Sequence, residues 1–122
     1  MHSMPSMEWS VEYTDEFGEW WDTLTEDEQV SVDAYVRQRG PQLPFPYSSG
    51  IEASRHSHMR ELRPQSGGKP LRVFYAFDPR RVAILLIGGD KTGDDRFYER
   101  MIPVADNLYD VHLKELAEEA KR

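Results

Sequence analysis

The pattern that most constrains the fold is a pair of strand-like segments in the second half of the chain. Residues 71–77 alternate between two sets of side chains with the period of two that is expected of a β-strand. Residues 82–87 are apolar on both faces, which is typical of a central strand. The intervening residues 78–81 include an Asp-Pro pair and predict a turn. These two strands are therefore expected to lie side by side and antiparallel.

A further strand is expected just before this pair. It covers residues 58–63, and the Pro- and Gly-containing residues 64–68 form the turn that follows it. Gly88 and Gly89 are expected to end the strand at 82–87. Three consecutive strands with short connections predict an antiparallel meander.

The N-terminal part predicts a strand followed by a helical hairpin. Residues 8–14 alternate with a period of two, and Thr14 can cap a helix that follows. Residues 25–28 have the form of a capping box and start a second helix, which ends at residues 39–41. The residues expected to face inward are Phe17, Trp20, Trp21 and Leu24 from the first helix, Val30, Ala34 and Tyr35 from the second, and Trp9 from the strand.

The C-terminal part predicts one long helix after residues 92–94, with Thr92 as a helix-capping residue. Pro103 is expected to interrupt or restart that helix. Its apolar stripe comprises Ala105, Tyr109, Leu113, Leu116 and Ala120. The order β-α-α-β-β-β-α predicts an α+β domain of two layers, in which the sheet packs against the N-terminal hairpin and the C-terminal helix.

Length and composition suit one soluble domain. The 122 residues allow a single domain over residues 7–122, and residues 1–6 are expected to be disordered or a remnant of expression. The absence of cysteine excludes disulfides, and no apolar run approaches the roughly 20 residues that cross a bilayer. The N-terminus lacks the features of a signal peptide, so a cytoplasmic location without a membrane partner is expected.

The charge distribution is uneven. Residues 1–50 carry ten acidic and two basic side chains, whereas residues 55–100 carry ten basic and six acidic ones, although the formal net charge of the chain is −7. A locally basic surface can bind phosphate on an acidic protein because salt screens charges over about 10 Å. The alternative is that both segments are simply solvated faces.

Several short motifs, in this order, resemble the RelE/ParE superfamily of toxins and most of all its HigB-type branch. They are residues 61–63 (ELR), residues 71–75 (LRVFY), the Gly-Gly-Asp-Lys-Thr at residues 88–92, and residues 96–98 (RFY). The resemblance covers residues 8–118. It implies a RelE-like fold and the toxin of a type II toxin–antitoxin system, an mRNA endonuclease (mRNA interferase) that acts on the ribosome and inhibits translation.

In the chemistry that this resemblance implies, the 2′-hydroxyl of the RNA attacks the adjacent phosphate. The protein must accept that proton, stabilise the phosphorane and protonate the leaving oxygen. No metal or other cofactor is implied, and His56 and His58 form a close pair without a matching carboxylate. The implied partners are the ribosome, mRNA and a cognate antitoxin, of the helix-turn-helix type in most HigB-type relatives.

Arg72 is the foremost candidate for binding the scissile phosphate, because its position matches the strand arginine of the family and a guanidinium keeps its charge. Glu61 and Arg63 share one face of their strand, where Glu61 is a candidate general base. The alternative for all three residues is a set of ion pairs on the face of the sheet. RelE has lysines where this chain has Met59 and Glu61, which leaves the base open.

Lys91 matches the HigB-type lysine that stabilises charge, and Tyr98 matches the tyrosine that stacks on a nucleotide beside the cut. The alternative for Tyr98 is a place in the core. Arg60, Lys69 and Arg96 are the further candidates for RNA binding. Loop 41–50, together with the basic face of the sheet, is expected to face the ribosome.

Two other functions fit the same fold. ParE-type toxins bind DNA gyrase without cutting RNA, and the acidic total charge and the missing lysines favour that alternative. The domain is otherwise a degenerate binding module whose acidic hairpin is its working surface.

Overall fold

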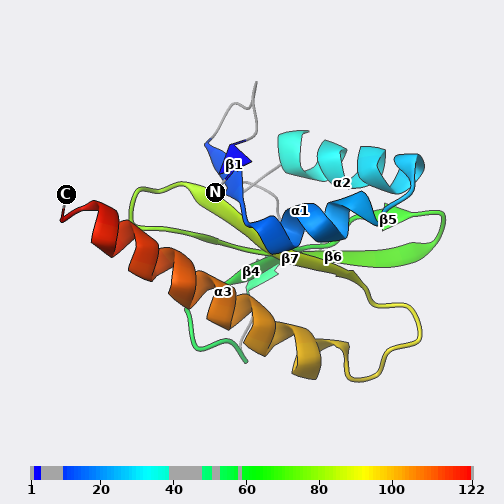
Figure 1. The fold of residues 1–122 in the computed structure, drawn as a ribbon. Helices are drawn as coiled ribbons and strands as arrows, with labels where there is room; N and C mark the ends of the chain where they lie inside the picture. Colours follow the sequence, from blue (N-terminus) through cyan, green and yellow to red (C-terminus); the bar gives the residue numbers. More distant parts are fainter. Residues whose placement is uncertain (1, 4–9, 39–47, 51–52, 58, 122) are drawn as a thin grey trace.

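The computed structural model describes residues 2–3, 10–38, 48–50, 53–57 and 59–121 of the chain, and in these residues helices cover both faces of a mixed sheet (Figure 1). The strands follow the order β1-β2-β7-β6-β4-β3, and β5 pairs with β6 beside that path. Their bounds are β1 His2–Ser3, β2 Val11–Tyr13, β3 Ser48–Gly50, β4 Arg60–Leu62, β5 Gln65–Ser66, β6 Lys69–Phe77 and β7 Ala83–Asp90.

The predicted meander is confirmed. Strands β4, β6 and β7 lie side by side and antiparallel, with Leu62 opposite Val73 and Phe74 opposite Ile87. The hairpin between β5 and β6 turns at Gly67 and Gly68, which both have positive φ, as a two-residue turn of type I′ requires.

Several features of the sheet differ from the prediction. Strands β3 and β5 lie where a loop (41–50) and a turn (64–68) were expected, and they pair with β4 and β6. Strand β2 pairs with β7 in parallel, so the sheet is not purely antiparallel. Parallel strands cannot be joined by a tight turn, and β2 and β7 are separated along the chain by the helical hairpin and by the other strands that follow it. His2 and Ser3, which were expected to be disordered, pair with Tyr13 and Glu12 of β2.

The expectation of two layers is wrong, because side chains on both faces of the sheet are buried. Leu71, Val73 and Tyr75 belong to a core cluster beneath the N-terminal hairpin, while Phe74 and Ala76 belong to a second cluster against the C-terminal helix. Figure 1 shows α1 and α2 on one side of the sheet and α3 on the other. The domain therefore has three layers, α-β-α.

The helical hairpin consists of α1 (Asp15–Asp22) and α2 (Glu26–Gln38). Both predicted caps are confirmed. The backbone N–H of Phe17 donates to the hydroxyl of Thr14 over 3.0 Å, and Thr25 and Glu28 exchange the two hydrogen bonds of a capping box.

The predicted inward face of α2 is wrong at Val30, which is 64% exposed, whereas Val32 and Val36 are buried. Tyr35 is partly buried against the same core, as expected. Glu28 sets the phase of this helix. Its carboxylate is buried, caps the helix and accepts a hydrogen bond from Lys69, so the positions four and eight residues later face the sheet. Trp20 and Trp21 are partly buried against the hairpin-side core, as expected.

Strand β7 does not end at its two glycines but continues through them to Asp90. A β-carbon on Gly88 would lie 2.2 Å from the ring of Trp20, and one on Gly89 would lie 2.8 Å from the ring of Phe97. The two glycines therefore let one aromatic ring approach the strand from each face.

Helix α3 (Phe97–Glu119) runs through Pro103 without a break, contrary to the prediction. Pro103 is exposed, and the buried residues Met101, Ile102 and Ala105 around it fix this part of the helix on the sheet, which offsets a proline cost of about 3 kcal/mol. The predicted stripe holds at Ala105 and Tyr109 and fails at Ala120, which is exposed.

Some predictions fall on residues that lie outside the described part of the chain. They concern Trp9, His58, residues 39–41 and most of loop 41–50, of which only β3 is described. No described helix combines the length and the apolar character that a membrane crossing needs.

Candidate active site

Three elements bring the foremost predicted residues together on the α3 side of the sheet. Glu61 lies opposite Phe74 in the register of β4 and β6, so its side chain points to the same face as those of Phe74 and Arg72. Tyr98, in the first turn of α3, packs its ring edge-on against Phe74 at 6.1 Å between centroids. The side chains of Arg72, Tyr98, Glu61 and Arg63 form what we call the Arg72 cluster.

The Arg72 cluster is linked by one chain of hydrogen bonds. The Nε of Arg72 donates to the hydroxyl of Tyr98 over 3.3 Å, and that hydroxyl donates to Oε1 of Glu61 over 3.1 Å. Arg63 approaches the same oxygen, since its Nε and Nη2 each lie 2.9 Å away. The Tyr98 hydroxyl therefore links the Arg72 guanidinium to the Glu61 carboxylate, and Arg63 binds that carboxylate as well.

These charges are mostly removed from water. Glu61 is 1% exposed and Arg72 is 8% exposed, and buried charges at such sites are tolerated only with close partners. Burial raises the pKa of the Tyr98 hydroxyl; the guanidinium of Arg72 opposes that rise and the carboxylate of Glu61 adds to it. Tyr98 therefore stays protonated at neutral pH.

One nitrogen of the Arg72 guanidinium, Nη2, remains available to donate a hydrogen bond to a ligand. Its Nη1 donates to the carbonyl of Leu71 over 2.9 Å, and Nη2 makes no hydrogen bond to any part of the chain that the structure describes. A guanidinium that is held by two of its nitrogens presents the third in a fixed direction. This donor can bind an anion.

Lys91 lies at the rim of the same cluster, just beyond the end of β7. Its ammonium nitrogen is 5.2 Å from the centroid of the Tyr98 ring, within the range of a cation–π contact. Its backbone N–H donates to the carbonyl of Pro70, which fixes the position of the residue beside β6. A second positive charge is thus available beside Arg72.

The structure does not bring every predicted residue to the cluster. Lys69 points to the hairpin side, where it binds the carboxylate of Glu28. Arg60 pairs in register with Tyr75, whose side chain belongs to the hairpin-side core, so strand alternation directs Arg60 to the face opposite Glu61. Arg96 is exposed at the start of α3 and is the one RNA-binding candidate on the side of Tyr98.

The capping role predicted for Thr92 is wrong. Its backbone N–H and its hydroxyl both bond to Oδ1 of Asp90, and α3 begins later, at Phe97. The carboxylate of Asp94 accepts the N–H of Arg96 in that region.

Sequence reasoning missed a second ionic cluster, at the β6–β7 turn. The carboxylate of Asp78 accepts hydrogen bonds from Arg80 and lies 2.9 Å from Nε2 of His112. Arg80 also binds Glu12 of β2. The Asp-Pro turn signalled the position of Asp78, and Arg80 lies in that turn, but His112 of α3 and Glu12 of β2 are far away in the sequence.

His56 is partly buried. Its Nε2 lies 2.7 Å from Oδ1 of Asp110, and its ring packs edge-on against that of Tyr109. In the described residues no group of three or more histidine and carboxylate side chains is arranged to hold a metal ion.

Comparison with known proteins places these residues in a family context. Residues 19–110 match the family described as "Phage derived protein Gp49-like (DUF891)", a span that contains the whole Arg72 cluster and Lys91. A protein of Mycobacterium tuberculosis (strain ATCC 25618 / H37Rv), "Putative toxin HigB3", is 41% identical over 91 residues, which are 71% of this chain and 78% of that protein.

A second protein of the same organism, "Putative toxin HigB2", is 40% identical over 80 residues. These residues make up 64% of this chain and 40% of the relative, so the chain spans less than half of that protein.

Proposed function

Because the chain belongs to the Gp49-like family of HigB-type toxins, we propose that it is the toxin of a type II toxin–antitoxin system and cleaves mRNA on the ribosome. The observation that carries the proposal is the hydrogen-bond chain from Arg72 through the Tyr98 hydroxyl to Glu61, which Arg63 also binds, with Lys91 at the rim. The protein acts in the cytoplasm and is neutralised by a cognate antitoxin.

The proposed reaction is attack of the RNA 2′-hydroxyl on the adjacent phosphate. Glu61 is too buried to reach the substrate, so Tyr98 mediates the transfer of the proton. The hydroxyl of Tyr98 accepts the 2′-proton while it passes its own proton to Oε1 of Glu61. The raised pKa of Tyr98 suits such a relay, because its hydroxyl carries a proton before the reaction begins.

Charge stabilisation is assigned to the two free cationic groups at the cluster. The Nη2 of Arg72 donates to a phosphate oxygen, where negative charge grows in the phosphorane. The ammonium of Lys91 protonates the departing 5′-oxygen or stabilises its charge. Arg63 is a positioning residue that holds the carboxylate of Glu61.

The test is mRNA cleavage in cell-free translation by the purified chain and by two arginine variants. Arg72→Lys keeps the charge but loses the planar fork, and we expect it to slow cleavage by about 100-fold. Arg81→Asn is the matched control, because Arg81 is exposed in the β6–β7 turn at φ 63°, a conformation that asparagine accepts. It should cleave like the unmodified chain.

Two outcomes would contradict the proposal. Equal cleavage by Arg72→Lys and the unmodified chain would remove Arg72 from the reaction. Inhibition of gyrase supercoiling without any cut in mRNA would replace the nuclease by the gyrase-binding function that ParE-type toxins have.

A further inference from the structure

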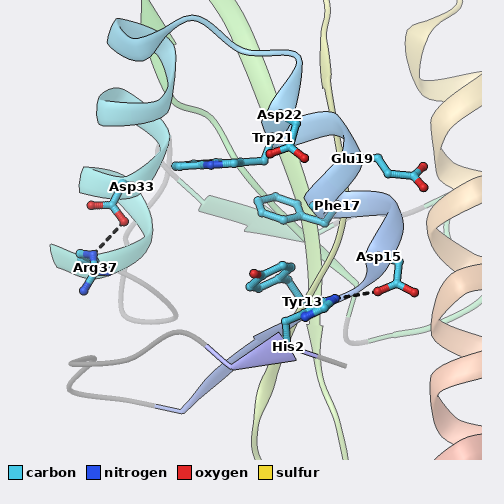
Figure 2. Close-up of a pocket in the computed structure, with 10 residues that line it drawn as sticks. His2, Tyr13, Asp15, Phe17, Glu19, Trp21, Asp22, Asp33 and Arg37 are labelled. Carbon is cyan, nitrogen blue, oxygen red and sulfur yellow. Dashed lines mark hydrogen bonds and ion pairs between the residues drawn. The ribbon is translucent and has the colours of Figure 1, made fainter.

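A groove of about 620 Å³ lies between β1, β2, α1 and α2 (Figure 2). It is on the hairpin side of the sheet, whereas the Arg72 cluster is on the α3 side. We call it the α1–α2 groove. None of the residues that line it takes part in the proposed reaction.

The floor of the α1–α2 groove is aromatic. The rings of Tyr13 and Phe17 lie 5.8 Å apart and those of Phe17 and Trp21 lie 6.4 Å apart, so the three form a row. Figure 2 shows this row facing α2. Phe17 is buried, whereas Tyr13 and Trp21 keep part of their surface exposed, and Gly18 adds no side chain. The floor offers apolar contact area to a side chain from outside.

The rim of the α1–α2 groove is acidic. Its carboxylates are those of Asp15, Glu19 and Asp22 from α1 and Asp33 from α2. Arg37 binds Asp33 over 2.7 Å, and His2 lies 2.6 Å from Asp15. In the described part of the chain Asp22 forms neither an ion pair nor a side-chain hydrogen bond, although it lies beside Trp21. Figure 2 shows Asp22 and Asp33 beside the aromatic row, whereas Asp15 and Glu19 extend from the side of α1 that faces away from α2, and the guanidinium among the lining residues is that of Arg37.

We propose that the α1–α2 groove binds a segment of the antitoxin in which lysine or arginine residues flank an apolar side chain. The apolar side chain lies on the partly exposed rings of Tyr13 and Trp21, and the cations lie near Asp22 and Asp33. The inference rests on the proposed function, since it takes the antitoxin as the partner.

Charge selects this occupant over others. The carboxylates repel the phosphates of RNA, so the groove does not extend the substrate site. A second copy of the chain would bring a molecule of net charge −7 against an acidic groove, which is unfavourable. A cationic segment instead gains above all from Asp22, which lies beside Trp21, and its apolar side chain removes aromatic surface from water.

The position of the groove has a consequence for neutralisation. Because the sheet separates the groove from the Arg72 cluster, this contact holds the antitoxin without touching Arg72. Variants of the groove should therefore lose antitoxin affinity and keep RNA cleavage, and Arg72→Lys should do the opposite.

The test is calorimetric titration of the full-length chain with the full-length protein encoded by the adjacent gene. Gly18→Leu fills the groove; the new β-carbon meets only the Tyr13 ring, at an ordinary 3.4 Å, and leucine favours a helix. Asp22→Lys reverses the charge beside Trp21. We expect each variant to weaken binding by about tenfold or more, and added salt to weaken binding of the unmodified chain.

The matched control is Glu118→Lys, which makes the same charge change at an exposed position near the end of α3. It should stay within about twofold of the unmodified chain. Thermal melts of all variants establish that they fold. Equal affinity of Gly18→Leu, Asp22→Lys and the unmodified chain overturns the proposal, and so does a dimer of the chain that Gly18→Leu abolishes.

Measuring mRNA cleavage in parallel separates this inference from the proposed function. Weakened antitoxin binding by the groove variants, in a chain that never cuts mRNA, removes the proposed reaction and keeps the groove. Intact cleavage with unaltered antitoxin binding removes the groove alone.

Discussion

At the scale of single residues, the Tyr98 hydroxyl links the charged groups of the candidate site. It accepts a hydrogen bond from Arg72 and donates one to Glu61, so it connects two buried groups of opposite charge that do not touch directly. Removing one partner of a buried ion is strongly destabilising, because an uncompensated charge remains in the interior. The hydroxyl is therefore important for folding as well as for the proposed reaction.

Tyr98→Phe should lower the free energy of unfolding by about 1–3 kcal/mol at neutral pH, because the ring contacts stay while Arg72 and Glu61 lose a shared partner. Urea unfolding of both chains measures the difference. A stability equal to that of the unmodified chain would mean that the hydroxyl is dispensable.

The same pair of chains carries a pH prediction. The pKa of Tyr98 is raised above its usual value of 10.0, so the folded state keeps the proton longer than the unfolded state. The stability from the neutral hydroxyl is present below pH 10 and is lost as the pH rises further. Tyr98→Phe should make this alkaline decline shallower, and the raised pKa of Tyr109 should leave part of it. Equally steep declines would contradict the assignment.

The candidate site was predictable only where strand alternation and the family resemblance agreed. Alternation places Arg72 and Glu61 on one face, and the resemblance adds Tyr98 and Lys91. Lys69 and Arg60, two of the further candidates for RNA binding, both point to the hairpin side and not to the Arg72 cluster. The burial of Glu61 depends on where α3 packs, which no local pattern specifies.

At the scale of elements, β7 fixes both helical layers. Gly88 receives Trp20 from the hairpin side, and Gly89 receives Phe97 from the α3 side. The residue that follows Phe97 is Tyr98, so the seat of Phe97 also positions the tyrosine of the candidate site.

Gly88→Ala should destabilise the protein by about 1–3 kcal/mol, because its methyl group would fall 2.2 Å from the ring of Trp20 and force the two apart. Gly18→Ala is the matched control, since its methyl group has room and alanine favours a helix; it should stabilise by about 0.5–1 kcal/mol. Thermal or urea unfolding measures both. A Gly88→Ala chain as stable as the control would show that α1 can shift without cost.

Element boundaries followed the sequence where side chains bond locally and departed from it where distant parts pack together. The caps at Thr14 and Thr25 are local and were predicted correctly. The parallel pairing of β2 with β7, the continuation of β7 through its glycines and the unbroken α3 all depend on contacts across the sheet. Periodicity in one segment carries no information about such contacts.

At the scale of the whole molecule, the acidic α1–α2 hairpin and the Arg72 cluster lie on opposite sides of one sheet. The hairpin covers one face of the sheet (Figure 1), and the Arg72 cluster with Lys91 lies on the side of α3. At physiological salt the field of one face is screened over about 8 Å, so each face meets its own partner.

This separation predicts how ribosome binding responds to charge. Asp27→Lys, at an exposed position of α2, should change ribosome affinity by less than about twofold, because it alters the face that is turned away. Lys91→Glu should weaken binding clearly and reduce its dependence on salt. Pelleting of ribosomes with either variant measures both effects. A large drop with Asp27→Lys would reverse the proposed orientation.

At Gly88 and Gly89 of β7, only the backbone of the strand separates the two helical layers. Trp20 rests there against one surface and Phe97 against the other, with no β-carbon between them. When either ring moves by a few tenths of an ångström, no flexible side chain absorbs the shift, so the backbone of β7 must move. A substitution that shifts one helical layer therefore requires a compensating change in the other layer.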